Sequence, residues 1–447
     1  MPNEGSRRNP SSDGCLFRLL LRSAMTIKAL SIPVDSATHA ARAARWQLST
    51  DERRVLEASF WCGAPSRQEL SNLTGYSITK IKALVSDLEI EGWLEEGAER
   101  DSSGGRRASS MQLGANFGVT VGIELGVTSA DVAVCKPDLH PLATRSVAVD
   151  VRDGPGVVMA LVSNLIEACL VECGLPTSAV SSIGMGVPGP VEFSSGLLIN
   201  PPIMPDWAGF SFREYFAPCF AAPVFIDNEV NLMALGELWN ARQGKAKSHP
   251  WLENFVVLKL GTGIGAGVIA RGEVYRGADG AAGDVGHICV DLSGPQCHCG
   301  NIGCLEAIAG APAIARAATA AGRSAASPVF ARMLVNKEEL STHDVAQAAR
   351  EGDIVANRII QEAGGRVGQM LATLVNILNP TSILIGGGVS HLGPLLLASI
   401  RQSVYARSLP LSTRKLRLDY LRLGDAAGLR GASALALLEV IRGRVSA

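Results

Sequence analysis

The sequence lacks a marked excess of charge of either sign. Its 447 residues carry 41 Lys and Arg against 42 Asp and Glu, which gives a formal net charge of −1. A protein that binds a polyanion over its whole surface needs a larger positive charge. Any contact with nucleic acid must therefore come from a local basic patch.

Long apolar runs are lacking as well. We find no stretch of about eighteen consecutive apolar residues, so the sequence predicts no membrane-spanning segment. The apolar segment 15–21 is too short for the core of a signal peptide, and Arg18 and Arg22 add charge to it. These features predict a protein without a membrane partner.

The cysteines lack the spacing of a secreted disulfide framework. Of the 10 cysteines, three lie within 297–304. Such crowding is typical of metal binding in a reducing compartment, so we expect the protein to be cytoplasmic. The remaining seven are interpreted as ordinary free thiols.

The length predicts two or three domains. Residues 1–46 have little periodicity and are interpreted as a mobile arm, within which Met25 is an alternative start. A helical block follows over 47–114. From Phe117 on, short β-branched runs alternate with helical segments, which predicts an α/β body.

The α/β body contains an internal repeat. Residues 119–134 (VTVGIELGVTSADVAV) and 255–270 (FVVLKLGTGIGAGVIA) both read as strand, glycine turn and strand. Each repeat opens one half of the body. The repeat predicts a duplicated fold of two lobes with a cleft between them.

The helical block 47–114 has the pattern of a winged helix-turn-helix. A helix capped at Thr50 is followed by a short helix from Ser66 to Gly75 and a longer one capped by Ser77. A strand, a basic loop and a return strand then form the wing. A small helical dimerisation domain with a solvated charged loop is the alternative. The candidate DNA-binding residues are Ser77, Thr79, Lys80 and Lys82 on the longer helix that Ser77 caps, with Arg106 and Arg107 in the wing.

A second cluster has the composition of a structural zinc site. His287 is followed by Cys297, Cys299 and Cys304, and Cys₃His is a common ligand set for zinc. Neighbouring glycines supply the turns that bring the sulfurs together. His298 is an alternative nitrogen ligand, and buried free thiols beside a core histidine are the alternative to a metal site.

Several segments resemble the ROK family (repressors, open reading frames and sugar kinases). Gly283-Asp-Val-Gly-His287 through CHCGNIGCLE resembles the zinc motif of that family. The other matching segments are Gly184-Met-Gly-Val-Pro-Gly-Pro-Val191, Ile226-Asp-Asn-Glu-Val-Asn231, Gly261-Thr-Gly-Ile-Gly-Ala-Gly267 and Ile385-Gly-Gly-Gly388. The resemblance runs from about Phe117 to the C-terminus.

The resemblance implies an actin-like, two-lobed sugar kinase fold behind an N-terminal winged helix-turn-helix. Lobe 1 would span 115–237 and be completed by about 430–447. Lobe 2, with the zinc site, would span 238–429. The N-terminal block resembles the repressor branch of the family, which includes regulators that respond to xylose and N-acetylglucosamine.

The positions that resemble kinase motifs depart from the family pattern. The segment Glu124-Leu-Gly-Val-Thr128 stands where family kinases have Asp-x-Gly-Gly-Thr, and Val127 adds a side chain at the phosphate approach. Glu229 occupies the position of the catalytic aspartate, and Asp284 stands where Glu is usual. A shift of a catalytic carboxylate by roughly one ångström can lower the rate about a hundredfold. We therefore predict a body that binds sugar without phosphorylating it, with no confident catalytic residue and a doubtful role for ATP and Mg²⁺.

The sugar-binding residues are expected to be polar groups that pair with hydroxyls. The predicted set is Gly189, Asn228, Glu229, Asp284, His287 and Glu306. Helix capping or support of the zinc site is the alternative for Asp284 and Glu306. Remnants of nucleotide loops, which could be purely structural, are Gly126, Thr128, Gly261, Thr262, Gly263, Gly265, Gly386 and Gly387.

These patterns together predict a sugar-responsive DNA-binding regulator. A sugar or sugar phosphate would close the lobes and change the DNA affinity of paired winged helices, which as a homodimer or homotetramer would bind a palindromic operator. An active ATP-dependent sugar kinase with an accessory DNA-binding arm is the second hypothesis. A protein-interaction module built on the N-terminal block is the third.

Overall fold

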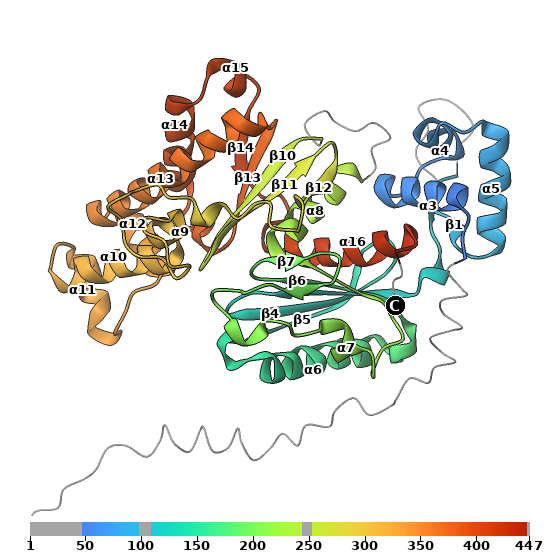
Figure 1. The fold of residues 1–447 in the computed structure, drawn as a ribbon, viewed down its shortest axis with the longest axis horizontal. Coiled ribbons are helices and arrows are strands. Elements are labelled where there is room, and N and C mark those ends of the chain that lie inside the picture. The colour runs from blue at the N-terminus through green and yellow to red at the C-terminus, as the bar shows by residue number, and fades with distance from the viewer. Residues whose placement is uncertain (1–46, 98–108, 244–252, 445–447) are drawn as a thin grey trace, which may run out of the picture.

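The computed structural model describes residues 47–97, 109–243 and 253–444. It consists of an N-terminal unit followed by two lobes, each built on a five-stranded sheet (Figure 1). The predicted arm 1–46 and the wing arginines Arg106 and Arg107 lie outside the described residues. The two-lobed α/β body expected from the sequence is confirmed.

In the described residues 47–97 and 109–114, the N-terminal unit contains three helices and a two-stranded sheet. They are α3 (Thr50–Cys62), α4 (Arg67–Thr74), α5 (Ile78–Ile90), β1 (Leu94–Glu96) and β2 (Met111–Leu113). Ser49 rather than Thr50 caps α3, because its side chain accepts from Glu52 N while the Glu52 carboxylate accepts from Ser49 N. Gly75 ends α4 in the left-handed conformation, which turns the chain into α5.

Lobe 1 contains a sheet with the strand order β5-β4-β3-β6-β9. The strands are β3 (Val119–Leu125), β4 (Ser129–Cys135), β5 (Pro141–Ala148), β6 (Val180–Val187) and β9 (Val224–Asn228). Strands β3, β4 and β5 are antiparallel neighbours, whereas β3, β6 and β9 run parallel. Smaller elements are β7 (Val191–Glu192), β8 (Leu197–Leu198) and α7 (Phe212–Phe216).

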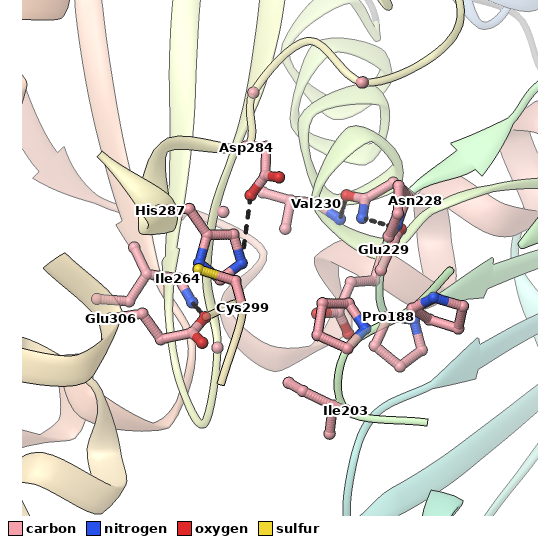
Figure 2. Close-up of a pocket in the computed structure, with 18 of the residues that line it drawn as sticks. Pro188, Ile203, Asn228, Glu229, Val230, Ile264, Asp284, His287, Cys299 and Glu306 are labelled. Carbon is pink, nitrogen blue, oxygen red and sulfur yellow. Dashed lines mark hydrogen bonds and ion pairs between the residues drawn. The ribbon is translucent and has the colours of Figure 1, made fainter. Parts of the chain in front are cut away.

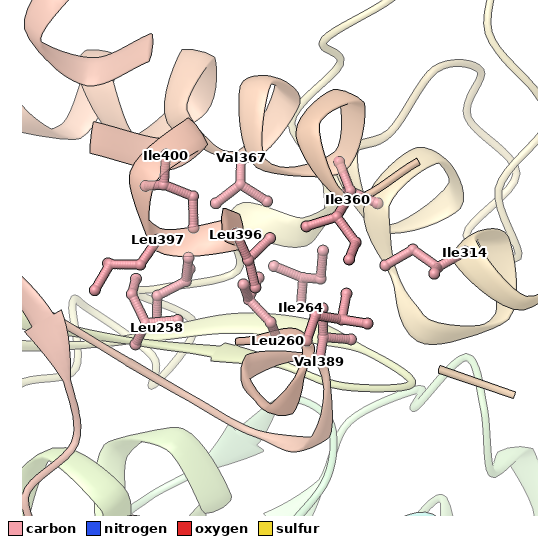
Figure 3. Packing of buried hydrophobic residues seen from close by; sticks show 14 of the residues in the cluster. Leu258, Leu260, Ile264, Ile314, Ile360, Val367, Val389, Leu396, Leu397 and Ile400 are labelled. Carbon is pink, nitrogen blue, oxygen red and sulfur yellow. The ribbon is translucent and has the colours of Figure 1, made fainter. Parts of the chain in front are cut away.

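Lobe 2 repeats this pattern with the strand order β12-β11-β10-β13-β14. The strands are β10 (Phe255–Leu260), β11 (Ile264–Ala270), β12 (Glu273–Tyr275), β13 (Ser382–Gly386) and β14 (Arg417–Tyr420). The helices are α9 (Leu305–Ala309), α10 (Ala311–Arg323), α11 (Pro328–Met333), α12 (Thr342–Arg350), α13 (Ile354–Leu378), α14 (Pro394–Arg407) and α15 (Pro410–Thr413). Figure 3 shows their aliphatic side chains packed on the sheet, with Leu258 and Leu260 facing Val367 and Ile400.

Two helices lie between the lobes. These are α8 (Glu229–Arg242), which follows β9 of lobe 1, and α16 (Ala427–Ile441), which packs on β3 and β6 (Figure 1). Their approach is close enough that a Cβ atom at Gly431 would lie 1.7 Å from the carbonyl oxygen of Leu232, so a side chain there is excluded. The expected domain boundaries at 237 and 429 fall inside these two helices.

One described helix is long and apolar enough to cross a membrane, which the sequence analysis did not anticipate. It is α6 (Pro155–Cys173). Its residues Val158, Met159, Val162, Ile166, Cys169 and Leu170 are buried in the core of lobe 1. This buried face packs against β4 and β5, whereas Val157 and Val171 of the same helix are exposed.

Candidate functional site

A cavity of about 380 Å³ lies between the two lobes. One wall comes from the loops after β6 and β9, and the other from the β10–β11 turn and the segment 280–287 (Figure 2). All six predicted sugar-binding residues line this cavity: Gly189, Asn228, Glu229, Asp284, His287 and Glu306. Residues nearly 120 positions apart in the chain therefore share one site.

Lobe 1 contributes Asn228, and its amide is held from two sides. Its Oδ1 accepts from Val230 N at 2.9 Å, which caps the start of α8, and its Nδ2 donates to Gly189 O at 2.9 Å. Gly189 has φ of 98°, a conformation that favours glycine. The amide is thus positioned before any ligand arrives, with its second hydrogen and second lone pair left for a ligand.

Lobe 2 contributes two carboxylates and an imidazole. Glu306 Oε2 accepts from Ile264 N at 3.0 Å, which ties the β10–β11 turn to α9. His287 Nε2 lies 3.8 Å from Asp284 Oδ1, and the Asp284 side chain is largely exposed to the cavity (Figure 2). A vicinal pair of sugar hydroxyls could pair with such groups, since carboxylates accept and a neutral imidazole can do either.

The glycine turns lie where the sequence places them, but they differ in their access to the cavity. Gly263 and Gly265 line it, whereas Gly386 ends β13, followed by Gly387 with φ of 83°. Gly261 and Thr262 belong to the same β10–β11 turn, and Gly126 and Thr128 to the β3–β4 turn. Val127 lines the cavity and has no positive φ, so its effect there is steric.

Lys259 is a charged residue of this site that the sequence analysis missed. Its Nζ lies 2.5 Å from Glu229 Oε2, and both side chains are mostly buried, at 19% and 12% exposure. Burial lowers the pKa of Lys259, but the charges of Glu229 and Glu124 outweigh this and raise it. Glu229 thus forms a buried ion pair with Lys259. A single lysine in the otherwise apolar strand FVVLKL was the available signal.

Glu124 forms the third member of this charged group. Burial raises the pKa of its carboxyl to about 7, against the opposing attraction of Lys259. Its carboxylate packs against Gly428 of α16, where a Cβ atom would lie 2.3 Å from it. We call Glu124, Glu229 and Lys259 the buried charge trio. It joins β3, α8 and β10 at the base of the cleft.

The four predicted metal ligands come together beside the cavity. The ligand atoms of His287, Cys297, Cys299 and Cys304 all lie within 4.8 Å of one another. His287 Nδ1 is 3.6 Å from Cys297 Sγ, and Cys299 Sγ is 3.7 Å from Cys304 Sγ. Tetrahedral zinc with ordinary bond lengths separates its ligand atoms by about 3.5 to 3.8 Å, so these side chains fit a metal ion.

Asn200 and Asn301 also line the cavity, although the sequence analysis did not select them. Asn200 adopts a positive φ of 44° before two prolines, and this Asn-Pro-Pro turn was a readable signal. Asn301 lies between two of the metal-ligand cysteines. Both amides add donors and acceptors to the site.

Four of the six residues selected for DNA binding lie at the start of α5. Ser77 caps this helix by accepting from Lys80 N, and Thr79 and Lys82 are exposed. Lys80 Nζ instead lies 2.6 Å from Asp51 Oδ2 and 3.9 Å from the centre of the Tyr76 ring. Its charge is therefore partly compensated within the unit.

The model of the ROK family matches residues 120–439, which is most of the chain. The chain belongs to the ROK family. It is 30% identical over 376 residues to the xylose repressor of Caldicellulosiruptor bescii, covering 84% of this chain and 92% of that protein. It is 31% identical over 312 residues to the glucokinase of Halalkalibacterium halodurans, covering 70% of this chain and 92% of that protein.

Solved ROK structures give the same picture. A ROK family transcriptional regulator, a homolog of the Escherichia coli Mlc protein, superposes with a TM-score of 0.71 and 26% identity, over 88% of this chain and 97% of that one. A ROK family glucokinase from Streptomyces griseus, in complex with glucose and AMPPNP, gives 0.62 and 28%, over 71% of this chain and 99% of that one. The fold is thus the actin-like ROK fold. Because 99% of the glucokinase is already matched by 71% of this chain, the glucokinase has almost no residues that could correspond to the N-terminal unit.

Proposed function

We propose that this protein is a sugar-responsive transcriptional repressor. Its ROK body binds a sugar or sugar phosphate in the interlobe cleft, and its N-terminal unit binds double-stranded operator DNA. The observation that carries the proposal is the N-terminal helix-turn-helix. The superposition with the ROK regulator covers 88% of this chain, whereas the superposition with the glucokinase covers 71% of this chain and already uses 99% of the glucokinase. Xylose repressors among the relatives support the same function.

The buried charge trio argues against phosphoryl transfer. A sugar kinase needs a carboxylate that accepts the proton of the attacking hydroxyl. Glu229 stands at that position, but its Oε2 lies 2.5 Å from the ammonium of Lys259, so this oxygen is already held in an ion pair and is not free to accept that proton. ATP and Mg²⁺ are therefore not part of the proposed function.

The cleft residues have distinct proposed roles. Asn228, Glu229, Asp284 and Glu306 bind hydroxyls, and the loop at Gly189 carries the sugar on the side of lobe 1. His287 uses Nδ1 for zinc and Nε2 for the ligand, in agreement with the side of the ring that faces each. Zinc, held by His287 and the three cysteines, would be structural and fix the shape of this wall.

DNA contacts are assigned to the exposed start of α5 and to the wing. Ser77, Thr79 and Lys82 would approach the bases or phosphates, and Lys80 would do so only in exchange for Asp51. Arg106 and Arg107 would bind phosphate or the minor groove. A homodimer or homotetramer in the cytoplasm would place two such units on a palindrome.

The proposal divides the chain by function. Residues 47–114 form the DNA-binding unit, 115–237 with about 430–447 form lobe 1, and 238–429 form lobe 2. Sugar binding is proposed to close the lobes and lower the DNA affinity. The sugar cleft and the DNA-binding unit are then coupled because the open and closed states differ in their affinity for DNA.

An active sugar kinase is the second candidate, because the glycine turn Gly261–Gly267 is retained and glucokinases are among the relatives. Two assays on the full chain separate the candidates. We expect a fragment of the protein's own upstream DNA to be retarded in a gel, and D-xylose or D-glucose to weaken this binding. We expect no turnover with ATP and either sugar. Robust turnover without DNA binding would overturn the proposal.

A further inference from the structure

Arg442 contacts the N-terminal unit and lobe 2 at once. It follows the last residue of α16, and its Nη2 lies 2.6 Å from Glu57 Oε1 of α3 and 3.2 Å from Glu273 Oε1 of β12. Glu439, almost fully buried on α16 itself, lies 3.9 Å away. The Arg442 side chain is only 21% exposed, so these charges interact in a partly dehydrated environment.

Helix α3 is docked on the same place by contacts that fix its position. Arg53 donates to the carbonyl oxygens of Val440 and Ile441 at the end of α16. Gln243, just after α8, donates to the carbonyl oxygen of Phe60 at 3.3 Å. Figure 1 shows α3 beside α8, β12 and α16, with α4 and α5 on its outer side. The N-terminal unit thus rests on the ends of helices from the body.

Two elements, α8 and β12, connect the sugar cleft with the place where α3 is docked. Helix α8 starts at Glu229 in the cavity wall and ends at Arg242, and its 14 residues span about 21 Å. The guanidinium of Arg242 lies 4.5 Å from the ring centre of Trp61 on α3. A displacement at the start of α8 therefore reaches α3 through one nearly fully buried helix.

Strand β12 provides a second connection. Arg276, directly after it, lies 2.7 Å from Asp227 Oδ2, and Asp227 Oδ1 accepts from the backbone N of Asn228 in the cleft. The chain then continues into 280–284, which lines the cavity. At its other end, β12 carries Glu273, the partner of Arg442. Only two residues, 274 and 275, thus separate the residue that contacts the cleft from the residue that contacts the junction.

We propose that Arg442, Glu57 and Glu273 form a coupling junction that transmits the state of the sugar cleft to the DNA-binding unit. Because α16 packs on the sheet of lobe 1 and β12 belongs to lobe 2, movement of one lobe against the other changes the distance between Arg442 and Glu273. When the distance between Arg442 and Glu273 changes, the ion pair between Arg442 and Glu57 changes as well. Because Glu57 belongs to α3, the position of α3 changes with it. This inference rests on the proposed function.

The test compares variants of the full chain in which one glutamate is replaced by the uncharged glutamine. Glu273→Gln removes the contact of Arg442 with lobe 2, and its side chain is 69% exposed, so folding should be preserved. Glu57→Gln removes the contact with α3. Glu351→Gln is the matched control, because it breaks a surface ion pair of 2.6 Å with Arg332 of α11. Figure 1 shows α11 and α12 on the side of lobe 2 away from the N-terminal unit.

The measurement is the ratio of the dissociation constants for the protein's own upstream DNA with and without D-xylose or D-glucose. We expect this ratio to fall about 2- to 30-fold in Glu273→Gln and in Glu57→Gln, and to stay at the wild-type value in Glu351→Gln. The sugar-induced rise in melting temperature should remain in all three, since the cleft residues are untouched.

Each result has one meaning. A wild-type protein whose DNA binding responds to sugar, with an equal response in both junction variants, overturns the coupling junction and leaves the proposed function standing. A wild-type protein that binds no DNA, or whose DNA binding ignores both sugars, overturns the proposed function and the junction with it. A reduced ratio in Glu351→Gln as well would show a nonspecific charge effect and also overturn the junction.

Discussion

Lys259 interacts with two carboxylates, Glu229 and Glu124, and its charge opposes the rise that burial causes in the pKa of Glu124. An isolated buried charge is expensive, and a lysine paired with one carboxylate offsets much of that cost. The second carboxylate, Glu124, is left with less compensation, and burial raises its pKa to about 7. The trio is therefore closest to neutral when Glu124 is protonated.

This titration predicts a pH-dependent stability at the residue scale. The folded protein holds the Glu124 proton above the ordinary pKa of 4.5, whereas the unfolded chain loses it near that value. The free energy of unfolding therefore falls as pH rises from about 4.5 to about 7. Glu124→Gln removes this loss. The free energy of unfolding of the variant minus that of wild type should therefore be about 2 kcal/mol larger at about pH 8 than at about pH 5.

Urea unfolding at both pH values measures this difference. Glu362→Gln serves as the control, because Glu362 is 70% exposed and pairs with Arg358 on the surface of α13. Its difference from wild type should be nearly the same at both pH values. A Glu124→Gln variant that behaves like this control would show that Glu124 titrates normally.

At the scale of elements, the segment between β12 and α9 has little regular structure of its own. It contains the short 3₁₀ turn Val285–His287 and isolated bridges such as Cys289 with Cys304. Gly300 and Gly303 adopt positive φ, which lets the chain fold back on itself. Shape in such a segment depends on a cross-link, and the four-ligand cluster provides the groups for one.

Loss of the metal should therefore weaken both stability and sugar binding. Cys299→Ser removes one ligand beside the cavity that Cys299 itself lines. We expect substoichiometric zinc, a lower melting temperature and a sugar affinity reduced by about 10-fold or more. Zinc content by atomic absorption and sugar-dependent thermal shift measure these effects. Cys219→Ser changes a half-buried cysteine of lobe 1 outside the four-ligand cluster and should match wild type. Unchanged sugar affinity in Cys299→Ser would confine zinc to a structural role.

At the scale of the whole molecule, the cleft is divided between two lobes whose sheets do not share a strand in the described residues. Lobe 1 brings Asn228 and Gly189, and lobe 2 brings Asp284 and His287. A sugar that binds both walls stabilises the closed arrangement over the open one. The connections through α8 and β12 would pass this movement to the N-terminal unit.

Sugar binding should thus make the molecule more compact. We expect a smaller radius of gyration in solution X-ray scattering when saturating D-xylose or D-glucose is added, whichever raises the melting temperature. Asp284→Ala removes an exposed carboxylate from the lobe 2 wall and should suppress both the thermal shift and the compaction. If that variant became more compact at sugar concentrations where it binds no sugar, sugar binding in the cleft would not be the cause of lobe closure.

Features with local causes were readable from the sequence. The caps Ser66 and Ser77, the glycine after α4 and the cysteine spacing of 297–304 act over a few residues, so the order of the helices and the metal ligands could be predicted. The charged trio was missed because Glu124, Glu229 and Lys259 are separated by more than 100 and by 30 residues. They lie on β3, α8 and β10, and only the packing of α8 with the two lobes brings them together.

The sequence by itself determined the helix-turn-helix, the repeated strand pattern, the His-Cys cluster that could hold a metal and the family of this protein, because those depend on short-range periodicity and spacing. Only the tertiary structure decided that Lys259 pairs with Glu229, that Lys80 is held by Asp51, and that Arg442 joins three parts of the molecule. Burial and charge compensation depend on which distant segments pack together. That packing is set by the two sheets and the helices α8 and α16 between them.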